Sequence, residues 1–298
     1  MMQDIRHCLT EERDLPLSAD DFQRIARIAH DEAGLAMADA KEALVYARLV
    51  KRLRQLSIDN FTDYIDLISQ PESEYERAVF ISIMTTNTTR FFREDHHFEF
   101  LAETVLPPLV AAARRGDRVR LWSAGCSSGE EPYSIAMTVL RLCPGAGSLD
   151  LKILATDIDR QILLAAQQGS YVEAALSELP EDVRKRHFSP ADKAGNCQIG
   201  DEIKALVTFK TLNLAKPWPV TGPFQVIFCR NVAIYFDSAM QERVWRGFAG
   251  TLAPGGYLFI GHSERLSSSV RHQFETVGMT SYRLRASHIP DRRGKGEY

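Results

Sequence analysis

A run of small residues between an apolar stretch and two acids has the pattern of a ligand-binding turn. Val119 to Ser123 is apolar, residues 124–129 are all small, and Glu130, Glu131 and Pro132 open a helical pattern. Small residues let a backbone approach a ligand closely, and acids with a proline are typical of a first helical turn. The run lacks the Lys-Ser/Thr ending of a phosphate loop, and its carboxylates would repel a pyrophosphate. They suit S-adenosylmethionine (SAM), which carries a sulfonium, an ammonium and ribose hydroxyls; an ordinary strand-to-helix turn is the alternative.

Further polar residues stand where three other apolar runs end. Asp157 closes the run 151–157, Asn213 follows 207–212, and Arg230-Asn231 follows 224–229. Ligands of open α/β sheets bind beyond the carboxyl ends of parallel strands, so we expect these residues to border one crevice. Asp157 is suited to hydrogen-bond ribose hydroxyls there, or alternatively to cap a helix predicted over 159–168.

No Ser-His-Asp or Cys-His arrangement accompanies the crevice in the sequence, and we interpret Cys126 as a packing residue rather than a nucleophile. A substrate that is itself the nucleophile fits this pattern. A glutamate side chain has an unperturbed pKa near 4.3, so it is anionic at pH 7 and needs no general base. Methyl transfer to it depends on positioning by donors such as Arg93, Arg230 and Tyr235. Each of these three is equally compatible with a structural ion pair or a core contact.

The elements that must position these residues follow from the hydrophobic pattern. Apolar runs alternate with helical patterns from 119 to 285, with a final strand pair within 274–284. This order predicts a doubly wound α/β sheet with an irregular stretch over 170–205 and a strand over 257–260 after a Pro-Gly-Gly turn. A dinucleotide dehydrogenase shares the layout, but the sequence lacks a G-x-G-x-x-G motif.

The first 90 residues read as a small helical bundle. A first helix follows a capping box at Ser18 to Asp21 and stops at Gly34, and further helices are expected near 38–57, from about 60, and at about 73–86. The second helix gathers Lys41, Arg48, Lys51 and Arg52 on one face, which is either a docking surface or simply solvated. A polar linker, 85–94, follows and is placed to fold over the crevice. A helix over 95–115 carries Pro107-Pro108 in its middle, where we expect a break.

Bulk composition bounds the functional class. The 298 residues carry a net charge of −3 and a pI near 6.3, which gives no whole-chain attraction to nucleic acid or membrane. Five cysteines without a C-x-x-C pair predict a reducing environment, no disulfide framework and no metal site. No apolar stretch resembles a secretory signal, so we expect a cytoplasmic protein, and a monomer.

Five motifs, in order, resemble the CheR-type chemotaxis receptor methyltransferases: TTNTTRFFRE, LWSAGCSSGEEPYSIAM, ATDID, FCRNVAIYFD and LAPGGYLFIGHSE. The resemblance runs from about residue 15 to 285. It implies an all-α domain (15–90) for receptor docking and a class I SAM-dependent methyltransferase domain (91–286) with a small β-type insert at about 178–210, followed by a disordered tail (287–298). It also implies methyl transfer from SAM to glutamates on the cytoplasmic domain of methyl-accepting chemotaxis receptors, giving glutamyl methyl esters and S-adenosylhomocysteine.

The resemblance also implies residue roles. Arg93, Arg230 and Tyr235 would act at the transferred methyl group, and the basic face of the second helix would dock the receptor. Residues 191–200 lack the glycine-rich stretch of members that tether to a receptor C-terminal pentapeptide. Nitrogen methylation and a non-catalytic SAM sensor remain the alternative functions. The implied SAM-binding residues are Asn87, Thr89, Arg93, Gly125, Glu131, Asp157, Asn213, Leu214, Arg230 and Asn231.

Overall fold

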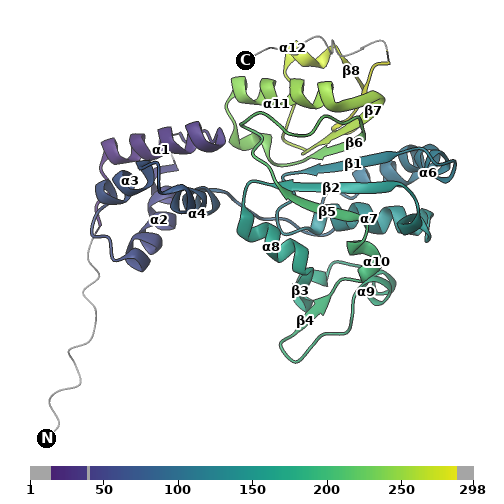
Figure 1. Cartoon of the computed structure of the whole chain (residues 1–298), viewed down its shortest axis with the longest axis horizontal. Helices are drawn as coiled ribbons and strands as arrows, with labels where there is room; N and C mark the ends of the chain where they lie inside the picture. The colour runs from purple at the N-terminus through teal and green to yellow at the C-terminus, as the bar shows by residue number, and fades with distance from the viewer. Residues whose placement is uncertain (1–14, 39–40, 287–298) are drawn as a thin grey trace, which may run out of the picture.

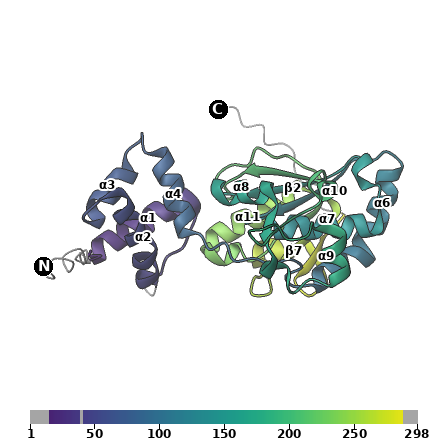
Figure 2. The ribbon, with the colours of Figure 1, turned by 90° about the horizontal axis from the view of Figure 1, so that it is seen from below.

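The computed structural model describes residues 15–38 and 41–286, which form a helical bundle beside an α/β domain (Figures 1 and 2). The tail predicted to be disordered, 287–298, lies outside the described residues. A short strap, residues 85–95, joins the two parts. Among the described residues no helix combines the length and apolar character needed to cross a membrane.

The bundle packs four helices around an apolar core. They are α1 (Ala19–Ala33), α2 (Glu42–Leu56), α3 (Phe61–Ser69) and α4 (Glu74–Met84). Ser18 caps α1 by accepting the N–H of Asp21, and Gly34 ends the helix in the left-handed conformation, as the sequence predicts. The second helix begins four residues later than predicted. Its predicted start includes residues 39–40, which lie outside the described chain.

The helix expected to kink or break at Pro107-Pro108 continues through them, with an irregularity just before the prolines. The helix runs as α5 (His96–Phe100), a π-helical turn η2 (Leu101–Val105) and α6 (Leu106–Arg114). Because proline has no N–H, the carbonyls one turn earlier lose their usual partners. The chain widens there, and the N–H of Leu106 bonds to the carbonyl of Leu101, five residues back.

A seven-stranded sheet in the order β5-β2-β1-β6-β7-β9-β8 forms the middle of the α/β domain, which confirms the predicted doubly wound class. The first five of these strands are parallel, and β9 and β8 are antiparallel additions. The strand order reverses between β1 and β6, and this switch point opens a crevice beyond their carboxyl ends. The bounds are β1 (Val119–Ala124), β2 (Leu151–Asp157), β5 (Val207–Thr211), β6 (Phe224–Cys229), β7 (Leu252–Ile260), β8 (Phe274–Gly278) and β9 (Ser281–Leu284).

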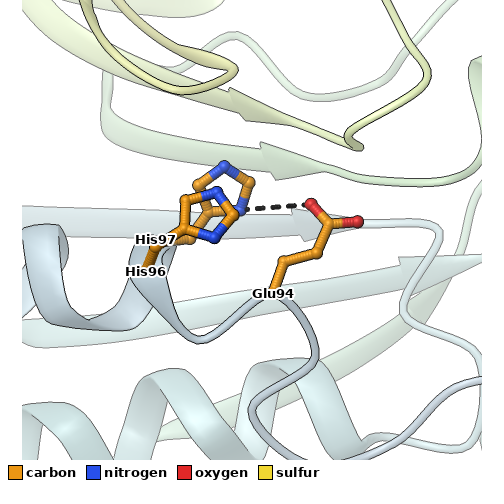
Figure 3. A group of neighbouring side chains, drawn as sticks. All are labelled: Glu94, His96 and His97. Atoms are coloured by element: carbon orange, nitrogen blue, oxygen red, sulfur yellow. Dashed lines mark ion pairs between the residues drawn. The ribbon is translucent and has the colours of Figure 1, made fainter.

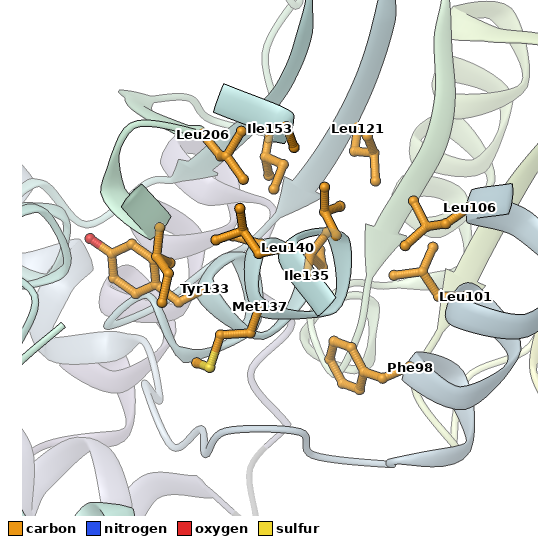
Figure 4. Packing of buried hydrophobic residues seen from close by; sticks show 14 of the residues in the cluster. Phe98, Leu101, Leu106, Leu121, Tyr133, Ile135, Met137, Leu140, Ile153 and Leu206 are labelled. Atoms are coloured by element: carbon orange, nitrogen blue, oxygen red, sulfur yellow. The ribbon is translucent and has the colours of Figure 1, made fainter. Parts of the chain in front are cut away.

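Helices cover both faces of the sheet. On one face lie α5–α6, α7 (Glu130–Leu142) and α8 (Arg160–Gln168), and Figure 4 shows α7 seated among side chains of β1, β2 and the η2 turn. On the other face α11 (Ser238–Thr251) and the short α12 (Ser268–Arg271) bury Trp122 of β1. This two-sided burial explains why the strands read as continuous apolar runs.

Two predicted boundaries are wrong. The sequence predicts the insert at about 178–210, but it begins and ends earlier. Its two-stranded sheet pairs β3 (Ser170–Val172) with β4 (Asn196–Gln198), and β5 already belongs to the main sheet. The two strands are three residues each and lie far apart in the chain, so no local pattern marks them as partners. Short helices fill the rest: η3 (Ala146–Ser148), η4 (Glu173–Leu176), α9 (Glu181–His187), α10 (Asp201–Lys204) and η5 (Ala233–Tyr235).

The second boundary concerns β7, which begins at Leu252 rather than Tyr257. Leu252 pairs with Phe224, and a register shift in the pairing absorbs the Pro-Gly-Gly sequence that reads as a turn. Gly255 has φ 75°, a left-handed value that glycine adopts without strain. The irregularity is therefore a bulge within the strand.

The bundle is held against the α/β domain by backbone and side-chain contacts. Leu35 and Phe236 form an isolated antiparallel bridge, and the N–H of Ala36 donates to the carbonyl of Tyr235 at 2.8 Å. Beside them, His30 Nε2 lies 2.9 Å from Asp237 Oδ2 across the domain boundary. The hydrogen bond to Asp237 raises the pKa of His30, and backbone donors, together with His30, lower the pKa of Asp237.

This pair predicts a pH-dependent contribution to the domain contact. Because the folded pKa of His30 is raised, its contribution is complete below the unfolded value near 6.5 and is lost as pH rises through the folded pKa. The pair is largely exposed, so we expect less than about 1 kcal/mol, a difference in Tm of about 1–2 °C. Thermal melts of His30→Ala against the wild type should show this difference at pH 5.5 and lose it at pH 8.5. The exposed His272→Ala is the control, and an equal difference at both pH values would contradict the prediction.

Candidate functional site

A cavity of about 910 Å³, part of it open to solvent, lies beyond the carboxyl ends of β1, β2 and β6. The sheet forms its floor, and the strap (residues 85–95) and the end of α1 border its other side. The structure brings to its wall every predicted SAM-binding residue and the predicted catalytic Tyr235: Asn87, Thr89, Arg93, Gly125, Glu131, Asp157, Asn213, Leu214, Arg230, Asn231 and Tyr235.

The turn after β1 is so tight that only glycine fits at position 125. Gly125 has φ 84°, and a Cβ built on it would lie 2.3 Å from Val232 Cγ2. Cys126, in the same turn, is buried, and burial raises the pKa of its thiol well above the usual value. It packs against Ala155 and Leu163, so it lacks the thiolate character of a nucleophile.

Asp157 anchors this turn to the end of β2. Its two carboxylate oxygens accept the N–H of Ser127 at 2.8 Å and of Asp159 at 3.0 Å. Helix α8 is capped by Asp159 instead, which accepts the N–H groups of Gln161 and Ile162. The capping alternative for Asp157 is therefore excluded, and its remaining lone pairs face the cavity wall. Burial raises the pKa of Asp157, while the backbone donors oppose that shift.

Arg230 lies in the opposite wall between two carboxylates. Its Nη1 is 3.2 Å from Glu131 Oε2 and its Nη2 is 3.5 Å from Glu94 Oε2, and it also donates to the carbonyl of Arg93. Burial raises the pKa of Glu131 despite the opposing charge of Arg230. Glu94 is less buried, and there Arg230 and His262 outweigh the desolvation and lower its pKa. With both carboxylates ionised, this part of the wall holds one negative charge in excess.

A second acid, Glu264, shapes the segment that follows β6. Its Oε1 accepts the N–H groups of Val232 and Ile234, and its Oε2 accepts those of Asn231 and Gly261, at 2.5–3.3 Å. Asn231 takes a left-handed φ of 58° at this point. The sequence analysis assigned Glu264 no role, although it closes the last of the five motifs. An acid just after the glycine that ends a buried strand is the signal that was available.

The strap is fastened across the cavity by hydrogen bonds to the α/β domain and within itself. Asn87 Nδ2 donates to Asp159 Oδ2 at 3.0 Å, and the hydroxyl of Ser127 donates to the carbonyl of Asn87 at 2.9 Å. Arg93 Nη1 donates to the carbonyl of Thr88 at 3.0 Å. The strap therefore holds its own polar side chains over the site, as its composition predicts.

Asn213 has a positioning role that its strand-end position did not reveal. Its amide donates to the carbonyl of Glu32 in α1 at 2.6 Å, and its Oδ1 accepts the N–H of Ala215. The contact ties the wall of the cavity to the helical bundle. Leu214, next to it, is buried.

The four basic residues predicted to dock the receptor lie at α2 or its N-cap, outside the cavity, and three of them make contacts within the bundle. Lys41 donates to the carbonyl of Ala36, and Arg48 donates to the carbonyl of Met84 at 2.6 Å and to Thr86 Oγ1 at 2.7 Å. Arg52 makes a two-pronged ion pair with Glu76, at 2.9 and 2.5 Å. Glu76 is buried, which explains the pairing: an acid there needs a cation. Lys51 remains exposed.

Comparison with known proteins matches both parts of the chain. Residues 20–85 match the family "CheR methyltransferase, all-alpha domain", and residues 87–283 match "CheR methyltransferase, SAM binding domain". The chain is 48% identical over 256 residues to a probable chemotaxis protein methyltransferase of Rhizobium etli, covering 85% of this chain and 96% of that protein. It is 42% identical over 276 residues to the chemotaxis protein methyltransferases of Salmonella typhimurium and Escherichia coli, covering 91% of this chain and 92% of each.

The four hydrogen bonds to Glu264 predict that Glu264→Gln, a nearly isosteric substitution, strongly lowers the stability of the protein. Each oxygen of the Glu264 carboxylate accepts two backbone N–H groups, so in Glu264→Gln the new NH₂ group faces two donors in either orientation. We expect a loss of roughly 2–4 kcal/mol in the free energy of unfolding, the cost of leaving two buried donors unpaired. Urea unfolding measures it, with Glu242→Gln, from the exposed Glu242–Arg246 pair, as the control. Equal stability of the two variants would contradict the role given to Glu264.

Proposed function

Because the chain belongs to the CheR methyltransferase family, we propose that it transfers methyl groups from SAM to glutamate side chains of methyl-accepting chemotaxis receptors. The family places it among chemotaxis protein methyltransferases with SAM as cofactor. The receptor glutamate, the glutamyl methyl ester and the residue roles below are the proposal. The observation that carries it is a cavity at the switch point of the sheet with an acid-rich wall and a cationic residue on its strap.

The chemistry of the wall fits SAM. The excess negative charge around Glu131, Arg230 and Glu94 suits a ligand with a sulfonium and an ammonium group. Asp157, on the other side of Gly125, offers acceptor lone pairs to ribose hydroxyls. Asn87, Thr89, Asn213, Leu214 and Asn231 would complete the pocket. When bound, SAM supplies an electrophilic methyl group.

The two arginines of the predicted site have different surroundings, and we assign them different roles. Arg230 is held between carboxylates inside the wall, so its charge is already balanced and its task is positioning. The guanidinium of Arg93 donates to one backbone carbonyl of the strap and borders the cavity. We therefore assign Arg93 to the incoming glutamate carboxylate, with Tyr235 beside it.

No general base is needed for this reaction. A glutamate carboxylate is ionised at neutral pH, so the chain has only to align it with the methyl group and restrain it. Burial raises the pKa of the Cys126 thiol, so that residue supplies no thiolate nucleophile. A protonated amine, by contrast, would have to lose its proton before it could attack the methyl group.

Product chemistry tests the proposed acceptor. The purified chain, with methyl-labelled SAM and the cytoplasmic fragment of a chemoreceptor, should label the fragment, and mild base should release the label as methanol. Glutamyl methyl esters hydrolyse in base, whereas N-methyl groups do not. A fragment with its methylation-region glutamates changed to glutamine is the control and should stay unlabelled. Base-stable label on the fragment would overturn the glutamate assignment, and no labelling with any receptor would favour a SAM sensor.

For receptor docking we propose the exposed edge of α2, where Lys51 and Arg54 lie. With a net charge of −3, the protein needs a local basic patch to approach an acidic receptor helix. Arg48 and Arg52 are committed to contacts within the bundle, so changing them would confuse docking with stability.

Reversing both exposed charges should weaken receptor engagement alone. For Lys51→Glu with Arg54→Glu we expect a KM for receptor raised about tenfold at low salt, an unchanged affinity for SAM, and a defect that shrinks as salt shortens the Debye length. Steady-state methylation at two salt concentrations measures it. Arg118→Glu, an exposed reversal at the far end of the sheet, is the matched control. A normal KM at low salt would leave this edge of α2 as plain solvated surface.

A further inference from the structure

Three side chains where the strap joins α5 converge, and each has a buried polar atom that makes no hydrogen bond. Glu94, His96 and His97 can each bring one ligand atom to a common point, and these atoms lie within 4.8 Å of one another (Figure 3). Glu94 Oε2, His96 Nε2 and His97 Nδ1 are all buried, and none has a hydrogen-bond partner. Glu94 Oε2 has an ion pair with Arg230 Nη2 at 3.5 Å but no hydrogen bond. Buried polar atoms without hydrogen bonds are costly, so three in one cluster call for a further partner.

The orientation of His97 shows which of its nitrogens is free. The side chain is fully buried, and Nε2 lies 3.1 Å from the carbonyl oxygen of Met279 and 3.0 Å from Thr280 Oγ1. A carbonyl only accepts, so Nε2 carries the hydrogen and the lone pair of the neutral ring is on Nδ1. That atom faces Glu94 Oε2 at 3.6 Å. A histidine whose N–H is held by a backbone carbonyl, with its other nitrogen turned to a carboxylate, has the outer contacts of a metal ligand.

The charge around the cluster also favours a cation. Glu94 and Glu131 share Arg230, which leaves one negative charge in excess. A third imidazole lies at the solvent side: His262 Nδ1 is 3.1 Å from Glu94 Oε1, and its side chain is 65% exposed. The cluster therefore has a route from solvent and a further candidate ligand on that route.

We propose that Glu94, His96 and His97 form a binding site for a divalent transition metal of the zinc type. Two imidazoles and one carboxylate are a ligand set that zinc accepts, with a fourth position left for water or His262. Ligands about 2.1 Å from a metal lie at most about 4.2 Å apart, so the side chains must close by roughly half an ångström. The cysteine pattern predicts no metal site, and this cluster contains no cysteine.

The site is coupled to the cavity through Glu94. A metal bound to Oε2 of Glu94 competes with Arg230 Nη2, which is 3.5 Å from the same atom. Binding would shift the charge balance of Arg230 toward Glu131, in the wall of the SAM pocket. This inference does not depend on the acceptor proposed above, because it concerns binding only.

Metal titration of the full chain tests the proposal. In competition with a chromophoric chelator, we expect the chain to bind one equivalent of Zn²⁺. With Co²⁺ in its place, we expect the visible absorption band of a four- or five-coordinate cobalt ion. His96→Ala should weaken Zn²⁺ binding at least about tenfold, while His272→Ala, which removes an exposed histidine elsewhere, should leave it unchanged. Glu94→Gln, which keeps the shape but removes the anionic ligand, should weaken binding as well if His96→Ala does not fold.

Two results would overturn the proposal. Stoichiometric binding that His96→Ala and Glu94→Gln both retain would place the metal elsewhere. No binding by the wild type at a tenfold excess of Zn²⁺ would also overturn the proposal, and would favour a proton shared between Glu94 and His97 as the partner of the unpaired atoms.

Discussion

The guanidinium of Arg230, buried between two carboxylates, is the contact on which the site depends. Arg230 itself follows the end of β6. Its ion pair with Glu131 links it to the first turn of α7, and its ion pair with Glu94 links it to the strap. A buried charge is costly to desolvate, so each of these segments is held where it satisfies the others. Removing Arg230 would leave the two carboxylates next to the cavity without their cation. The arrangement therefore specifies geometry more than it adds stability.

Other acidic residues around the cavity accept hydrogen bonds from backbone N–H groups. Asp157 accepts two N–H groups at the turn after β1, Asp159 caps α8 and receives the amide of Asn87, and Glu264 accepts four N–H groups beyond β6 and β7. Turns at strand ends expose N–H groups that no strand pairs with. A buried carboxylate satisfies several of them at once, and so the crevice has fixed walls without regular secondary structure.

The helical bundle takes part in the same construction. It reaches the α/β domain through Leu35, Asn213 and the strap, and these contacts also border the cavity. The contact between the two domains therefore also forms part of the pocket wall. A change in how the bundle sits would therefore alter the pocket wall.

Sequence alone determined the fold class and the edge of the sheet where the site lies, because both follow from local pattern. Strand ends are marked by small and polar residues, and parallel strands bring those ends together, so Gly125, Asp157, Asn213 and Arg230 were found in one cavity wall. The tertiary structure alone decided the partner of each charged side chain. Arg52 and Glu76 are 24 residues apart, and Arg230 and Glu131 are 99 apart, so no spacing rule pairs them. The same reason hid the β3–β4 pairing, the backbone donors that Glu264 receives from beyond β6, and the approach of Arg230 to Glu94: each is created by burial, which brings distant segments together and favours a partner for each charged or polar group. Glu94, His96 and His97 are neighbours in the sequence, but only the fold buries their polar atoms without hydrogen bonds.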